Sequence, residues 1–96
     1  MRPEFHPAAA EELTAAVQAY EERVLGLGRD LRLEAQRVTE LLCITPNIGE
    51  PLGGEHRRFP LRRFPFGLIY RVSADTLLVV AVAHQRRIPG YWKQRT

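Results

Sequence analysis

The sequence predicts an α+β domain in which an antiparallel helical hairpin packs on a small, mainly antiparallel sheet. Apolar residues recur at helical spacing through the first half of the chain, whereas the second half, after residue 56, shows the period-two pattern of strands. With 96 residues, the chain has room for one core of helices packed on a sheet. We therefore expect a single domain, residues 1–96, with a short first strand, then two helices, then three strands.

The first helix is predicted to begin at Pro7, after a short strand or lead-in at the N-terminus. Proline is tolerated in the first helical turn, because its missing N–H would have no partner there in any case. Gly26 and Gly28 then allow the positive φ that ends a helix and reverses the chain. One stripe of this helix has the spacing of a buried face, and it consists of Ala9, Leu13, Ala16, Val17, Tyr20 and Val24.

A second helix is predicted over residues 27–44 and is ended by Pro46. Two amphipathic helices joined by a glycine turn indicate an antiparallel hairpin. Cys43, the only cysteine, is interpreted as a small core residue, and residues 46–54, rich in Pro and Gly, as a loop. The apolar positions of the second helix again share one face, and they are Leu31, Ala35, Val38 and Leu42.

Three strands, close enough in sequence for an antiparallel meander, are predicted over residues 57–63, 67–73 and 76–84. The last strand is an almost uninterrupted apolar run, so we expect it to be covered on both faces. Pro60 favours either a sheet-edge position or a kink for the strand predicted over residues 57–63. Arg71 shares a face of the middle strand with Ile69. Two placements stay open for Arg71: the open side of the sheet, or an ion pair with an acid from a helix.

The composition is that of an ordinary globular domain, with 45% apolar and 26% charged residues. The N-terminus lacks the apolar run of a secretion signal, and no stretch approaches the roughly 18 apolar residues of a membrane span. We therefore expect a cytoplasmic protein that does not enter a membrane. One cysteine and three dispersed histidines have no zinc-binding spacing, so neither a metal ion nor another cofactor is expected.

Charge divides the chain in two. Residues 1–55 carry ten acidic side chains and five arginines, a net charge of −5, whereas residues 56–96 carry nine lysines or arginines and one aspartate, a net charge of +8. Eight of these nine basic residues are arginines, and the planar guanidinium of arginine is suited to binding phosphate and carboxylate groups. Each one alone is interpreted as solvated or ion-paired. Together they favour an anionic partner such as RNA, DNA or an acidic protein segment.

The junction between the last strand and the tail gathers polar and aromatic groups at residues 84–92. His84 either acts as an acid or base near neutral pH, binds phosphate when protonated, or ends the strand by hydrogen bonding to a backbone carbonyl oxygen. Tyr91 and Trp92 either fold back over the core, aided by the Pro-Gly turn before them, or stack on bases. No Ser-His-Asp arrangement, phosphate-binding loop or paired-carboxylate signature is present, so most enzyme classes are unsupported.

The order and spacing of these segments resemble the RelE/ParE superfamily of type II toxin-antitoxin toxins, and lie closer to its ParE-like branch. The resemblance implies a helical hairpin on an antiparallel sheet, growth inhibition, and a cognate antitoxin that wraps an extended or helical segment around the toxin. We expect the antitoxin to contact Leu13, Val17 and Tyr20 of the first helix. The resembling segments span nearly the whole chain: FHPAA (5–9), YEER (20–23), NIG (47–49), RFPLRRFP (58–65), IYRV (69–72) and AVAHQRRIPGYW (81–92).

The superfamily divides over its target. ParE-like members poison DNA gyrase, whereas RelE-like members cut mRNA on the ribosome without a metal, using basic residues and often a C-terminal Tyr or His. The only lysine here is Lys93, so the catalytic lysines typical of RelE-like nucleases are missing. The His-x-Arg-Arg of residues 84–87 is closer to the ParE-like pattern. The favoured expectation is gyrase inhibition through contacts alone, and the alternative is ribosome-dependent mRNA cleavage.

The two alternatives imply different roles for the same basic residues. In a RelE-like nuclease, His84, Arg86 and Tyr91 are expected to be catalytic, moving the proton of the ribose 2′-OH and bracing the phosphate. In either branch, we expect contacts to the target or to nucleic acid from Arg58, Arg62, Arg63, Arg71, Arg86, Arg87 and Trp92.

Overall fold

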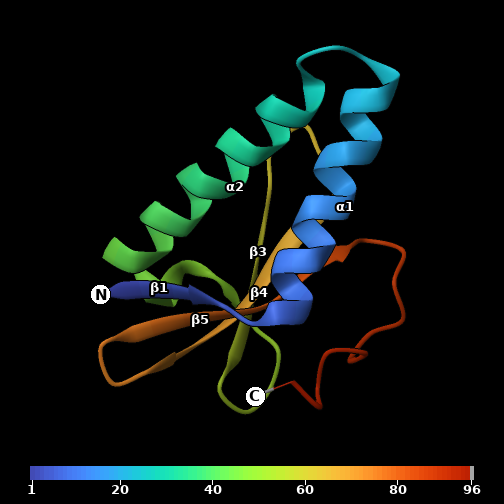
Figure 1. Ribbon diagram of the computed structural model, residues 1–96. Helices are drawn as coiled ribbons and strands as arrows, with labels where there is room; N and C mark the ends of the chain where they lie inside the picture. The colour runs from blue at the N-terminus through green and yellow to red at the C-terminus, as the bar shows by residue number, and fades with distance from the viewer. Residues whose placement is uncertain (96) are drawn as a thin grey trace.

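The computed structural model describes residues 1–95 and confirms the predicted α+β architecture, with two helices packed on one face of a five-stranded sheet (Figure 1). The strand order across the sheet is β1-β5-β4-β3-β2, in which β1 is parallel to β5 and the other pairs are antiparallel. No helix in the described part of the chain is long and apolar enough to cross a membrane. The elements in chain order are β1 (Arg2–Phe5), α1 (Pro7–Arg23), α2 (Leu27–Ile44), the 3-10 helix η1 (Pro46–Ile48), β2 (Glu50–Pro51), β3 (His56–Pro60), β4 (Phe66–Ser73) and β5 (Thr76–His84).

Side-chain hydrogen bonds start the first helix and close the turn between the two. The Nδ1 atom of His6 accepts a hydrogen bond at 3.0 Å from the backbone N–H two residues later, and so caps α1. The Glu21 carboxylate accepts hydrogen bonds from the N–H groups of Gly26 (2.8 Å) and Gly28 (3.0 Å). A Cβ at Gly28 would collide with a backbone carbonyl oxygen of α1. Glycine at this position therefore permits the close approach of the helices.

The predicted apolar faces of both helices point to the core, with one exception. Val24 was wrongly assigned to the α1 stripe, because it lies in extended conformation just after the helix and is 57% exposed. Cys43 is half-buried and packs against the core, as predicted. The rest of the α1 stripe is buried or half-buried, namely Ala9, Leu13, Ala16, Val17 and Tyr20. The four predicted core positions of α2, Leu31, Ala35, Val38 and Leu42, are all buried.

Because of a β-bulge, β5 contributes side chains to two apolar clusters, one on each face of the sheet. The register between β4 and β5 shifts between Ile69 and Tyr70, where β5 contains one extra residue, Val80. Val79 and Val82 consequently belong to the cluster that packs against the helices. Residues 80, 81 and 83 belong to a second cluster on the opposite face. β5 is therefore buried on both faces, as its apolar sequence predicts.

Residues 46–54 are more regular than the predicted loop, since they contain η1 and β2. Tyr70 is fully buried, and its hydroxyl donates to the Pro46 carbonyl oxygen at 2.7 Å and accepts from the Gly49 N–H at 3.0 Å. The Arg57 guanidinium donates to two carbonyl oxygens of the same segment. Side chains from β3 and β4 thus hold this segment in place, and its local sequence carries no sign of them.

β3 ends at Pro60, three residues earlier than predicted. The chain then turns back to β4 through Leu61 and Phe64, which are buried, and through Arg63, whose φ of 67° is left-handed. β2 pairs only with Arg57 and Arg58, so the Pro60 end of β3 has no neighbouring strand on that side. This agrees with the sheet-edge placement expected for Pro60.

Candidate binding site under the C-terminal tail

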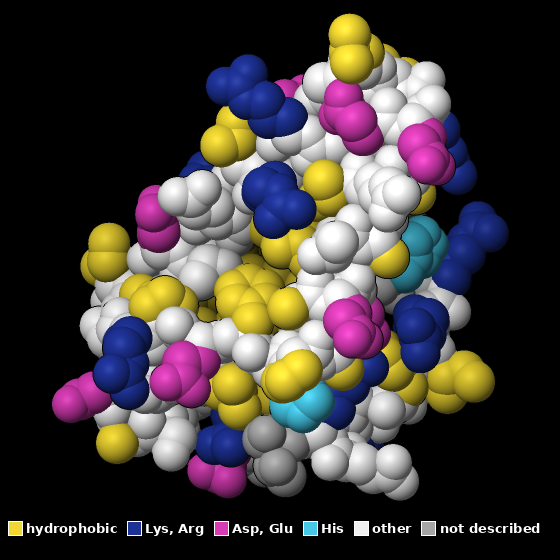
Figure 2. All heavy atoms as spheres, in the orientation of Figure 1, with side chains coloured by type: hydrophobic (Ala, Val, Ile, Leu, Met, Phe, Trp, Pro, Cys, Tyr) yellow, Lys and Arg dark blue, Asp and Glu magenta, His cyan; other side chains and the backbone are white. Residues whose placement is uncertain are grey.

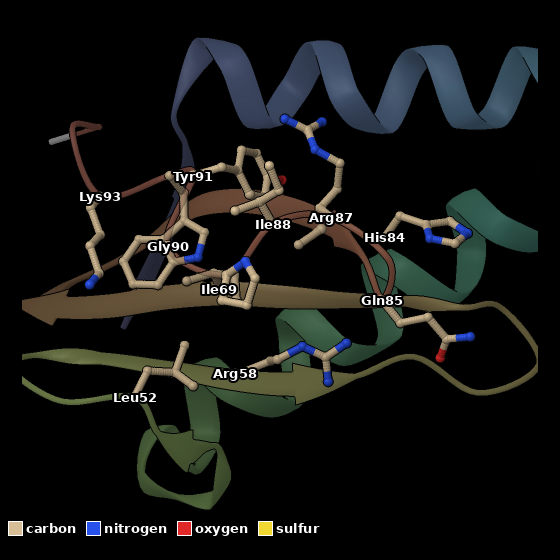
Figure 3. A pocket seen from close by; sticks show the side chains of 13 residues that line it. Leu52, Arg58, Ile69, His84, Gln85, Arg87, Ile88, Gly90, Tyr91 and Lys93 are labelled. Atoms are coloured by element: carbon tan, nitrogen blue, oxygen red, sulfur yellow. The ribbon is translucent and has the colours of Figure 1, made fainter.

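The C-terminal tail, residues 85–95, folds back over the sheet face that the helices leave open (Figure 3). Trp92 packs there against Ile69 and Val80 and is only 7% exposed. Its ring lies 4.6 Å from that of His56 on β3. Of the two interpretations of the tail aromatics, the structure supports folding over the core. Trp92 therefore offers a target little surface.

A cavity of about 500 Å³ lies between the tail and this face of the sheet. Figure 3 shows Arg58 and Ile69 entering it from β3 and β4, and Tyr91 and Lys93 from the tail. Among residues 1–95, none of the residues that line the cavity is acidic. Within the same range, no group of three His, Cys, Asp or Glu side chains is arranged to hold a metal ion. The cavity is thus basic, with a partly apolar wall.

Glu12 on α1 ties the tail to the rest of the molecule. Its carboxylate accepts hydrogen bonds from the Tyr91 hydroxyl (2.8 Å) and from both terminal nitrogens of Arg95 (2.8 and 3.1 Å). It also accepts the Val82 N–H at 3.0 Å, while Arg95 donates to the Val80 carbonyl oxygen at 3.0 Å. β1 pairs with only the first four residues of β5. Glu12 and Arg95 therefore satisfy backbone groups of β5 beyond the end of β1.

The same contacts set the protonation states of Glu12 and Tyr91. Burial disfavours the charged form of Glu12, but hydrogen bonds from Arg95, Tyr91 and the β5 backbone outweigh it and hold the pKa of the carboxyl below its ordinary value. Burial and then the hydrogen bond to Glu12 raise the pKa of Tyr91 to about 12. The Arg87 guanidinium lies 3.8 Å from the centroid of the Tyr91 ring. At neutral pH the site therefore contains an ionised Glu12 and a protonated Tyr91.

We expect docking of the tail to weaken at acidic pH. Because the pKa of Glu12 is lowered in the folded state, its contribution to stability is complete above the unfolded-state pKa, ordinarily 4.5, and is lost as the pH falls through the folded-state value. The fluorescence of Trp92, the only tryptophan, should then shift to longer wavelength below about pH 4. Glu12→Gln should lack this transition, and an unchanged transition in that variant would contradict the assignment.

His84 lies at the end of β5 and makes local contacts. Its Nδ1 atom accepts a hydrogen bond from the Arg86 N–H at 3.0 Å, and its ring meets Phe66 edge-on at 5.1 Å. The structure therefore supports a strand-ending role for His84, but the predicted partner was wrong, because the imidazole accepts from a backbone N–H and, within residues 1–95, does not donate to a carbonyl oxygen. Its ring points away from Tyr91, the other candidate for proton transfer (Figure 3).

The arginines expected to contact a target do not form one patch. Arg58 and Arg87 line the cavity, and Arg71 pairs in register with His56 on the same sheet face. This resolves the two placements of Arg71 in favour of the open side of the sheet, since it forms no ion pair within residues 1–95. Arg86 is exposed in the tail.

Arg62 and Arg63 lie elsewhere, beside α2. The Arg63 guanidinium is 3.5 Å from the Asp30 carboxylate, and the Arg62 N–H donates to the Glu34 carboxylate at 2.7 Å. Both arginine side chains are exposed. They therefore lie apart from the cavity and remain available for contacts on the helical side of the molecule.

The residues expected to contact the antitoxin lie along α1. Leu13, Val17 and Tyr20 are half-buried against the helix-facing core, and Tyr20 meets Phe64 edge-on at 5.3 Å. Figure 2 shows hydrophobic side chains gathered in the hollow between the two helices. These three residues thus contribute to the core and keep part of their surface exposed.

Glu12 was not among the residues singled out from the sequence, although a signal for it existed. It lies three residues after Ala9 and four before Ala16, both of which belong to the buried stripe of α1. A carboxylate at core spacing requires a buried partner. Its partners, Tyr91 and Arg95, lie about 80 residues away in the chain. The sequence therefore indicates that Glu12 needs a buried partner but does not identify that partner.

Comparisons with known proteins agree with this fold. A family model described as the ParE toxin of type II toxin-antitoxin system, parDE, matches residues 4–89. A solved structure from P. aeruginosa, described as a chromosomal ParDE TA system, is 20% identical with a TM-score of 0.64, covering 88% of this chain and 95% of that chain. A search of curated proteins finds no match. Because the family model spans most of the sequence, this chain belongs to the ParE toxin family of type II toxin-antitoxin systems.

Proposed function

We propose that this toxin acts in the cytoplasm by binding DNA gyrase as a protein ligand, without chemistry of its own, and that a cognate antitoxin neutralises it. Membership of the ParE toxin family supports this branch, because gyrase poisoning is the activity that the resemblance to ParE-like toxins implies. The antitoxin is proposed to contact α1 at Leu13, Val17 and Tyr20, where half-buried apolar side chains suit a docked segment. The basic second half of the chain would attract an acidic partner segment.

The hydrogen bonding and the pKa of Tyr91 favour a binding role over a catalytic one. A general base must accept a proton near the working pH. The Tyr91 hydroxyl instead donates a hydrogen bond to Glu12 and keeps its proton, and its pKa is raised to about 12. The imidazole of His84 accepts a backbone hydrogen bond at the end of β5. Both candidate proton-transfer groups are therefore engaged in holding the tail and strand end, which favours contact over chemistry.

A purified gyrase assay tests this proposal. We expect the toxin to inhibit ATP-dependent supercoiling and to accumulate cleaved DNA bound to gyrase. Equimolar cognate antitoxin should restore supercoiling. In a translation extract the same toxin should leave mRNA intact, because the Tyr91 hydroxyl and the Nδ1 atom of His84 are both engaged in hydrogen bonds within the protein.

Tyr91→Phe separates the two functions. It removes the hydroxyl but keeps the aromatic ring, so a toxin that works by contact should retain inhibition of gyrase within about threefold. A nuclease that uses Tyr91 would lose mRNA cleavage altogether. Untouched supercoiling at saturating toxin would refute the gyrase proposal, and so would mRNA that is cut by the wild type and spared by Tyr91→Phe.

A further inference from the structure

Arg58 is a half-buried cation without a counter-ion. It reaches from β3 into the cavity under the tail, and within residues 1–95 no carboxylate forms an ion pair with it. Lys93 adds a second cation from the tail (Figure 3). Glu50, which lies opposite Arg58 on β2, forms no ion pair with it, and the Glu12 carboxylate already accepts hydrogen bonds from Arg95 and Tyr91. A partly desolvated guanidinium of this kind favours an external anion.

Gly67 determines the position of this guanidinium. A Cβ at Gly67 would stand 2.6 Å from Cζ of Arg58 and 2.8 Å from its Nε and Nη2. Because glycine has no Cβ, the guanidinium can lie against the backbone of β4 at the edge of the cavity. The Arg58 side chain is thus positioned by the shape of the sheet and keeps its donors available.

The remaining wall of the cavity suits an aliphatic group. Ile69 is 2% exposed and forms the floor of the cavity. Leu52 and Ile88, which also line the cavity, are 36% and 78% exposed. Large apolar side chains left exposed beside a cavity mark surface that a partner can cover. An occupant with one anionic and one aliphatic group would therefore match both parts of the wall.

Among the described residues that line the cavity, neither Trp92 nor Tyr91 offers a free aromatic face on which a base could stack. Trp92 is only 7% exposed. The ring of Tyr91 has the guanidinium of Arg87 at 3.8 Å and that of Arg95 at 5.0 Å from its centroid. Recognition of single-stranded nucleic acid depends on such stacking. The cavity therefore favours a protein segment over a nucleotide.

We propose that this cavity binds a segment of a partner protein that presents a carboxylate to Arg58 and an adjacent aliphatic side chain to the exposed apolar residues Leu52 and Ile88. The proposal goes beyond inhibition of gyrase, because it names the chemistry of a peptide site and not the identity of the partner. A toxin that fails in the gyrase assay can still bind the peptide, so the two proposals fail separately.

Two blocked dipeptides, N-acetyl-Leu-Glu amide and N-acetyl-Leu-Gln amide, test the site by NMR titration of the wild-type protein. The single indole N–H signal of Trp92 and the methyl signals of Ile69 report on the cavity. We expect the Glu dipeptide to bind roughly fivefold more tightly than the Gln dipeptide, because only its carboxylate forms an ion pair with Arg58 and accepts from two N–H groups of the guanidinium. Uridine monophosphate, the third probe, should bind more weakly than the Glu dipeptide.

Three variants test whether Arg58 causes the preference for the Glu dipeptide over the Gln dipeptide. Arg58→Gln should abolish the preference for Glu. Gly67→Ala keeps the charge but displaces the guanidinium, and should reduce the preference by at least about half. Arg32→Gln, at an exposed arginine of α2 that is outside the cavity, should leave it unchanged. Equal binding of the two dipeptides, a preference that survives Arg58→Gln in the folded protein, or tighter binding of uridine monophosphate would overturn the proposal.

Discussion

Replacing Glu12 with alanine is expected to release the tail from α1 and to lower the free energy of unfolding by about 2–4 kcal/mol. The change removes one carboxylate that is 17% exposed. It leaves the Tyr91 hydroxyl and the Val82 N–H without an acceptor, and the 18% exposed Arg95 guanidinium with only the Val80 carbonyl oxygen. Urea denaturation measures the loss of stability. A shift of Trp92 emission to longer wavelength measures the release of the tail, since Trp92 is buried under it.

Release of the tail should also weaken the toxin. The tail carries Arg86 and Arg87, two of the arginines expected to contact the target, so Glu12→Ala should displace them and raise the toxin concentration for half-maximal inhibition of gyrase by at least about tenfold. Glu11→Ala is the matched control, because Glu11 is the preceding residue of α1 and is exposed. It should leave stability, Trp92 emission and inhibition unchanged. Equal effects of the two substitutions would show that Glu12 does not hold the tail.

Replacing Gly49 with alanine is expected to destabilise the protein by about 2–4 kcal/mol, although its backbone (φ −70°, ψ 151°) is open to any residue. The cost is steric. The added methyl would meet the buried ring of Tyr70 at 2.8 Å from Cε1 and 2.9 Å from Cζ, besides colliding with its hydroxyl. Since the ring is 0% exposed, it cannot move aside freely. The midpoint of urea denaturation measures the effect.

Tyr70→Phe is the control for this prediction. It removes the hydroxyl that bonds Pro46 and Gly49, and should cost about 1–3 kcal/mol by itself. It also removes the atom with which the methyl added by Gly49→Ala collides. The double variant should therefore lose less stability than the sum of the two single variants. Strictly additive losses would mean that the methyl does not press on Tyr70.

Much of the fold could be predicted because it depends on local periodicity. The spacing of Leu31, Ala35, Val38 and Leu42 marks a buried helical face wherever the helix docks, and all four are buried. β1 was expected as a short first strand, but its parallel pairing with β5, far away in the sequence, was not predicted. β2 was not predicted at all, because it has only two residues and its pairing with β3 closes a loop. Short segments carry too little periodicity of their own.

The candidate site, too, was predicted from the sequence only in part. The sequence by itself determined that basic and aromatic groups follow a rigid apolar strand, because composition and strand pattern are properties of consecutive residues. Only the tertiary structure decided what these groups do. The end of β1 and the bulge of β5 leave backbone groups that Glu12 and Arg95 satisfy, which brings the tail across the sheet and commits Tyr91 to a hydrogen bond. Contacts between residues about 80 positions apart depend on how the elements pack, and no local pattern encodes them.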